Sequence, residues 1–163
     1  ITLALAAPAF AGEQYVDRTG FAVSGYDVVA YRSLDQAPVG QPQPQAVPGR
    51  ADITADYNGA TFAFASEENR DLFLTDPAFY APAFDGHCAY GVAVNGKVPA
   101  NPHLWRIVDD VLYLNITTGV VEDWEADIPG FLAAAYDNWV ELEDDGASGR
   151  RIPGFSSEAP VNN

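Results

Sequence analysis

The residues with the greatest capacity for chemistry lie in one short segment, Phe84–Gly91. It holds a carboxylate, an imidazole and the only thiol of the chain, at Asp85, His87 and Cys88, and its glycines permit unusual backbone geometry. The second of the two histidines, His103, follows 15 positions after Cys88. A thiolate and imidazoles together suit zinc or copper. The sequence therefore predicts a metal site formed by Cys88 with His87 and His103, with Asp85 as an alternative oxygen ligand.

This predicted metal site requires a bend of the backbone between His87 and Cys88. Successive side chains of an extended chain point to opposite faces, so His87 and Cys88 can bind one ion only if the chain bends between them. The flanking glycines allow such a bend. Metal ligands also need partners that orient them by hydrogen bonding. We expect Asp27, Tyr31 and Tyr90 to act as these partners.

A metal-free binding module is a second interpretation of the same residues. Buried cysteine commonly behaves as a small apolar side chain. In that case Cys88 belongs to the core, and the aromatic residues Tyr31, Phe84, Tyr90 and Trp105 line a ligand pocket or a surface for a protein partner. Reaction of the native thiol with a labelling reagent separates this case from a metal-bound cysteine.

A cysteine-dependent enzyme is a third interpretation. Cys88 would be the nucleophile and His103 its base, with Asp85 or Asp27 orienting the imidazole. The chain carries no nucleophile elbow or other signature of a cysteine enzyme. The sequence thus favours a binding or delivery module over an enzyme.

The charge of the chain limits its partners. Its 163 residues include 8 Lys and Arg against 23 Asp and Glu, which gives a net charge of −15. Such a chain repels nucleic acid and anionic lipid. We expect no nucleic-acid partner, and a metal ion, a small ligand or a periplasmic protein as the partner.

Residues 1–11 predict export. They are uncharged and end in Ala9-Phe10-Ala11, a pattern that resembles a signal-peptidase site. We interpret 1–11 as a signal-peptide remnant and expect a mature bacterial protein that starts at Gly12, located in the periplasm or secreted. The later sequence contains no run of 18 apolar residues, so it predicts no insertion into a membrane. A lone cysteine leaves no internal disulfide, so the core must hold the fold.

The remaining pattern predicts an α+β fold, with a small antiparallel sheet built from hairpins that packs with short helices and a C-terminal amphipathic helix. Asn58-Gly59 predicts a hairpin turn between strands, and residues 104–115 predict a second hairpin. Ser66 caps a predicted helix that ends before Pro77. Asp127 begins a helix whose stripe of Phe131, Ala135 and Trp139 faces the core.

Three segments complete this plan. Residues 12–142 form the predicted domain, residues 33–50 a long loop rich in proline and glutamine, and residues 143–163 a mobile tail without periodicity. The sequence contains no evident internal repeat.

The order of several short motifs resembles the secreted bacterial YHS-domain proteins over roughly residues 20–142. The motifs are Gly25-Tyr26-Asp27-Val28-Val29-Ala30-Tyr31, Tyr57-Asn58-Gly59-Ala60-Thr61-Phe62-Ala63-Phe64, Asn69-Arg70-Asp71-Leu72-Phe73, Gly86-His87-Cys88-Ala89-Tyr90-Gly91 and Leu112-Tyr113-Leu114-Asn115. The resemblance implies a small exported α+β domain associated with heavy-metal handling. One departure is His87, a potential ligand, where such proteins usually carry tyrosine, and a second is a longer loop at 33–50.

Overall fold

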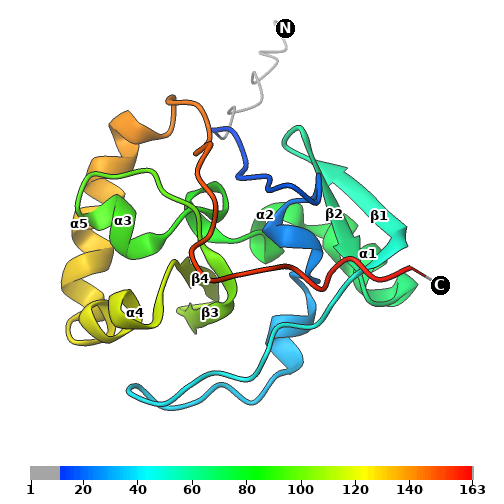
Figure 1. Ribbon diagram of the computed structural model, residues 1–163, viewed down its shortest axis with the longest axis horizontal. Coiled ribbons are helices and arrows are strands. Elements are labelled where there is room, and N and C mark those ends of the chain that lie inside the picture. Colours follow the sequence, from blue (N-terminus) through cyan, green and yellow to red (C-terminus); the bar gives the residue numbers. More distant parts are fainter. Residues whose placement is uncertain (1–11, 163) are drawn as a thin grey trace, which may run out of the picture.

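The structure, a computed structural model, describes residues 12–162, and it has the predicted α+β class. The helices are α1 (Glu67–Thr75), α2 (Pro77–Tyr80), α3 (Ala89–Ala93), α4 (Thr118–Glu125) and α5 (Ile128–Leu142), and the strands are β1 (Arg50–Tyr57), β2 (Ala60–Phe64), β3 (Asn101–Val108) and β4 (Val111–Asn115). The four strands form two separate antiparallel pairs, β1–β2 and β3–β4, in place of one sheet (Figure 1). The predicted signal remnant 1–11 lies outside the described residues.

The two hairpins share one backbone plan. Each joins an 8-residue strand to a 5-residue strand through a two-residue turn with positive φ angles. The cross-strand pairs also coincide, because every pair of β1–β2 has a counterpart 51 positions later, as Arg50↔Phe64 has in Asn101↔Asn115. Both ladders even shift register at the same place.

The helices after the hairpins continue this repeat. Ser66 caps α1 by accepting the Asn69 N–H, and Thr117, 51 positions later, caps α4 by accepting the Val120 N–H. Asp76 then caps α2, and Asp127 caps α5 in the same way. Helices α2 and α5 differ only in length, 4 against 15 residues, so the second half carries the large amphipathic helix.

Each half also begins with a left-handed turn. Residues 23–25 and 84–86 all have φ between 50° and 83°. A positive φ is unfavourable for Val23 and Phe84 and acceptable for Gly25 and Gly86. Gly25 is required for a second reason, since a Cβ there would collide with Pro160. The chain thus holds two strained turns at equivalent places, and surrounding contacts must stabilise them.

An aromatic pair fills the core of each half. In the first half, Phe62 of β2 packs on Phe73 of α1 with ring centroids 5.0 Å apart. In the second half, the equivalent residues Tyr113 of β4 and Trp124 of α4 pack with centroids 6.0 Å apart. All four side chains are buried. The repeat is hard to see in the sequence because most of the equivalent residues named here match in type only, such as Ser66 with Thr117, Phe62 with Tyr113 and Phe73 with Trp124.

Residues 143–162, which we call the strap, are an ordered part of the fold in place of the expected mobile tail. The strap runs beside the N-terminal segment and ends at the edge of β1, where Ala51 N–H donates to Val161 O at 2.9 Å (Figure 1). Ile152 and Ala159 of the strap are buried. The sequence does not indicate these contacts, because they are irregular hydrogen bonds and single apolar side chains, which produce no periodic pattern.

The long loop is tied to the body of the protein at its far end. Residues 34–49 contain no helix or strand. Trp105 Nε1–H donates to Pro44 O at 2.9 Å, and Arg106 donates to Ala37 O at 3.1 Å. Arg106 is also paired with Glu125 in a buried ion pair. These bonds hold the proline-rich loop against β3.

The repeat predicts that equivalent caps contribute equally. We expect Ser66→Ala and Thr117→Ala each to lower the free energy of unfolding by about 1 kcal/mol, because each leaves a helix N–H without its side-chain acceptor. Urea denaturation followed by circular dichroism measures this. Thr118→Ala, an exposed neighbour that caps nothing, is the control and should change the value by less than about 0.5 kcal/mol. A severalfold difference between the two cap variants would contradict the equivalence.

Candidate functional site

Cys88 is fully buried and caps a helix. Its exposed fraction is 0%, and its Sγ accepts the Gly91 N–H at the start of α3 at 3.4 Å. The thiol in turn donates to Asn115 Oδ1 at 3.4 Å. Burial raises the pKa of the Cys88 thiol above its ordinary value, although nearby backbone N–H groups act in the opposite direction. The sulfur is therefore a neutral group with both of its hydrogen-bonding functions in use.

His87 is also fully buried, and both of its ring nitrogens are engaged. The Ser148 N–H of the strap donates to Nε2 at 3.0 Å, so Nδ1 carries the proton and donates to Phe84 O at 2.9 Å. The ring packs edge-on against Tyr15 and lies near Trp139. Burial lowers the pKa of His87 to about 4. The imidazole is neutral at pH 7 and joins the first turn of its half to the strap.

His103 contacts a different set of rings. It packs against Tyr26, with ring centroids 4.9 Å apart, and against Phe155 of the strap. Its Nδ1 accepts the Ala46 N–H of the long loop at 3.0 Å. Burial lowers the pKa of His103 below its ordinary value. Within residues 12–162, no three or more His, Cys, Asp and Glu side chains gather where they could hold a metal ion, so the structure does not bring His87, Cys88 and His103 together as a ligand set.

The repeat explains why His87 and Cys88 are placed inside. They follow the turn 84–86 just as Tyr26 and Asp27 follow the turn 23–25. Cys88 N–H donates to Val98 O, and Asp27 N–H donates to Val47 O. The first residue of each pair, Tyr26 or His87, contacts the strap. Tyr26 OH accepts the Glu158 N–H, and His87 Nε2 accepts the Ser148 N–H.

The second residue of each pair, Asp27 or Cys88, faces backbone N–H groups at equivalent positions of its half. Asp27, 0% exposed, accepts N–H groups of Val29, Ala30 and Ala65 at 2.8 to 3.1 Å. The backbone groups that act on the Cys88 sulfur are their counterparts, at Tyr90, Gly91 and Ile116. Cys88 is thus the equivalent of a buried capping carboxylate.

The other expected partners take structural roles as well. Tyr31 OH donates to Pro102 O at 2.7 Å, and its ring meets that of Trp105 edge-on at 5.2 Å. Tyr90 donates its backbone N–H to Asn115 Oδ1, and its ring packs on Phe131 of α5. These aromatic side chains pack in or against the core of the protein.

Asp85 is a buried carboxyl group in the left-handed turn. Its Oδ1 accepts from Gln14 Nε2 at 2.8 Å, while its buried Oδ2 has no hydrogen-bond partner within the described residues. Burial, together with the nearby Glu143 carboxylate, raises the pKa of Asp85 to about 6. Asp85 therefore takes up a proton more readily than an exposed aspartate does.

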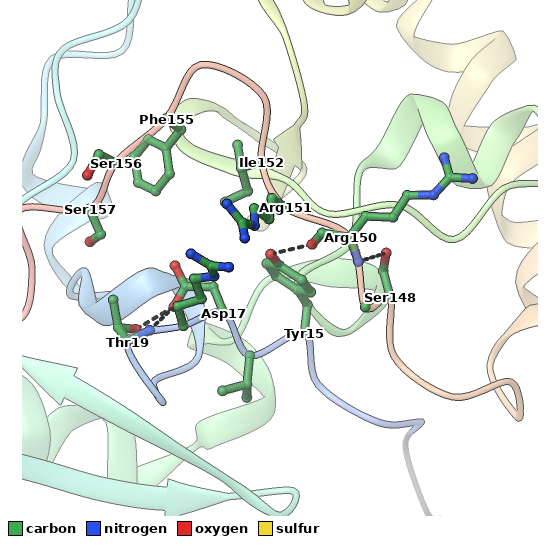
Figure 2. Close-up of a pocket in the computed structure, with 13 residues that line it drawn as sticks. Tyr15, Asp17, Thr19, Ser148, Arg150, Arg151, Ile152, Phe155, Ser156 and Ser157 are labelled. Carbon is green, nitrogen blue, oxygen red and sulfur yellow. Dashed lines mark hydrogen bonds between the residues drawn. The ribbon is translucent and has the colours of Figure 1, made fainter.

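An open pocket of about 890 Å³ lies between segment 15–19 and strap residues 148–157, and its lining includes neither Cys88 nor the two histidines (Figure 2). Its wall combines the ring of Tyr15, the partly buried Phe155 and the guanidinium-bearing residues Arg18, Arg150 and Arg151. Sequence reasoning missed it because its two sides are far apart in the chain. The available signal was the adjacent pair of arginines in a strongly acidic chain.

Comparisons with known proteins add no relative. No family model matches the chain, and neither the curated proteins nor the solved structures include a match. None of the helices within residues 12–162 has the length and apolar character that a membrane crossing requires. The YHS resemblance and the predicted export remain predictions.

The capping role of Cys88 predicts a graded loss of stability. We expect Asp27→Ala to lower the free energy of unfolding by about 3 kcal/mol or more and Cys88→Ala by roughly 1–3 kcal/mol, because buried N–H groups lose an acceptor that is strong in one case and weak in the other. Asp71→Ala, which removes an exposed ion pair, is the control with a loss near zero. Urea denaturation of the three variants gives the ranking, and an unaffected Cys88→Ala would refute the capping role.

Asp85 and His87 predict opposite responses to pH. The pKa of Asp85 is raised in the folded state, so its contribution to stability falls as the pH rises from about 4 to 6. The pKa of His87 is lowered, so its contribution rises between about pH 4 and 6.5. From pH 4 to 6.5, the unfolding free energy of Asp85→Asn should therefore rise more steeply than that of wild type, and that of His87→Gln less steeply. Denaturation at several pH values tests both signs, and parallel profiles would contradict the assignment.

Proposed function

We propose that this protein is a small-ligand binding module in which the Tyr26–Asp27 and His87–Cys88 pairs hold the fold and the pocket beside the strap receives the ligand. The observation that carries the proposal is the separation of these two features. The Cys88 thiol and the His87 imidazole are buried and engaged in hydrogen bonds, whereas the pocket is open and polar.

The position of the pocket supports a binding role. Its two walls are the segments that flank the repeated halves. The Tyr15 hydroxyl donates to Arg150 O at 3.0 Å and so joins the two walls, and the buried Ile152 is one of the lining residues. Binding sites are commonly formed by such loop segments on a rigid scaffold. The volume is within the range of small-molecule sites.

The competing proposals need groups that the fold already uses. Copper or zinc binding through Cys88 with His87 and His103 requires the loss of the hydrogen bonds that the Ser148 and Ala46 N–H groups donate to the two imidazoles. A nucleophilic Cys88 requires a thiolate, while burial raises the pKa of this thiol. Both considerations support a module that is neither a metal carrier nor a cysteine enzyme.

Thiol labelling tests this proposal against the metal site. We expect Cys88 of the native protein to resist an aromatic disulfide reagent both before and after addition of a strong chelator, and to react in denaturant. The rate is followed by absorbance, with the Cys88→Ser variant as the blank. Rapid labelling that begins only after chelator is added would support metal binding instead, and rapid labelling without chelator would support the enzyme.

A further inference from the structure

The arginine side chains that have no ion-pair or hydrogen-bond partner within the described residues line one pocket of this acidic protein. Five of the eight basic side chains have partners. These are Arg50 with Asp52, Arg70 with Asp71, Arg106 with Glu125, and Arg32 and Lys97 with backbone carbonyl groups. Within the described residues the guanidinium groups of the other three, Arg18, Arg150 and Arg151, make no ion pair or hydrogen bond, and all three residues line this one pocket.

Two of these arginines come from opposite walls. Arg18 belongs to the N-terminal segment and Arg151 to the strap. Figure 2 shows the Arg151 side chain over the pocket, between Ile152 and Tyr15, whereas the Arg150 side chain extends away from it. All three arginines are exposed, so they are available to a ligand. Arg150 contributes its backbone to the wall, because its carbonyl accepts the Tyr15 hydroxyl.

The one carboxylate among the described residues that line the pocket, that of Asp17, already accepts hydrogen bonds. Asp17 Oδ1 accepts the backbone N–H and the hydroxyl of Thr19 within its own turn. The pocket lining therefore has more positive than negative groups, in a chain whose overall charge is −15. Such a local excess of guanidinium groups is suited to carboxylate and phosphate oxygens, which arginine binds in a bidentate manner.

We propose that the pocket binds a small organic anion, whose oxyanion group is held by Arg18 and Arg151 and whose apolar body packs against Phe155. This inference rests on the proposed function, because it names the ligand class of the same pocket. The partly exposed ring of Phe155 on the wall provides the surface for the body of the ligand. The negative field of the remaining surface makes the local arginines essential for the affinity.

Protein-observed NMR with three probes tests the proposal at constant ionic strength. Phenyl phosphate and benzoate carry an oxyanion on a ring, and phenol carries the ring alone. We expect the two anions to shift the amide signals of residues 15–19 and 148–157 and phenol to bind at least about tenfold more weakly. Comparison of phenyl phosphate with benzoate shows which oxyanion is preferred.

Matched arginine variants complete the experiment. Arg18→Gln and Arg151→Gln should each weaken binding of the better anion roughly tenfold or more, whereas Arg150→Gln, which removes the same charge from a side chain that extends away, should change it less than about twofold. All three positions are exposed, and unchanged denaturation curves verify folding.

The outcomes separate the two proposals. If phenol shifts the pocket signals as strongly as the anions do and the arginine variants have no effect, the anion class is wrong and the binding pocket stands. An equal loss in all three variants indicates general charge attraction and also overturns the anion site. If no probe shifts the signals of these two segments, both the ligand class and the proposed function fail.

Discussion

A buried acceptor beneath each left-handed turn is the interaction on which both halves of this protein depend. Backbone N–H groups from the residues after each turn and from the end of the following hairpin face this acceptor, and an unpaired buried donor is costly. Asp27 accepts these groups in the first half, and Cys88 takes the same position in the second. The carboxylate and the sulfur differ in strength, but the backbone that surrounds them is the same.

The preceding ring of each pair extends this arrangement to the surface. Tyr26 and His87 each accept an N–H from the strap, so one irregular segment joins two equivalent positions of the repeat. The pocket lies where the strap passes the N-terminal segment (Figure 2). The fold therefore separates the groups that maintain it, which are buried, from the arginine side chains that remain available to a ligand.

Local patterns were sufficient to predict most elements of the fold. The Asn58-Gly59 turn, the Ser66 cap and the Asp127 start of α5 each depend on neighbouring residues, and the structure confirms all three. The repeat and the strap depend on contacts between distant residues, which single-residue patterns do not encode. The surroundings of the candidate site depend on such distant contacts as well. Cys88 and His87 have the chemistry of metal ligands, and only their burial and partners reveal the capping role.

The state of the His87 ring tests this account most directly, because a structural imidazole and a ligand imidazole differ at the same atom. Long-range proton–nitrogen NMR correlations report which ring nitrogen carries the proton. The account predicts a proton on Nδ1, a bare Nε2 that accepts the Ser148 N–H, no titration between pH 7 and 5, and no change on addition of zinc chloride. A proton on Nε2, a titration near pH 6.5, or a shift of both ring signals with zinc would contradict it.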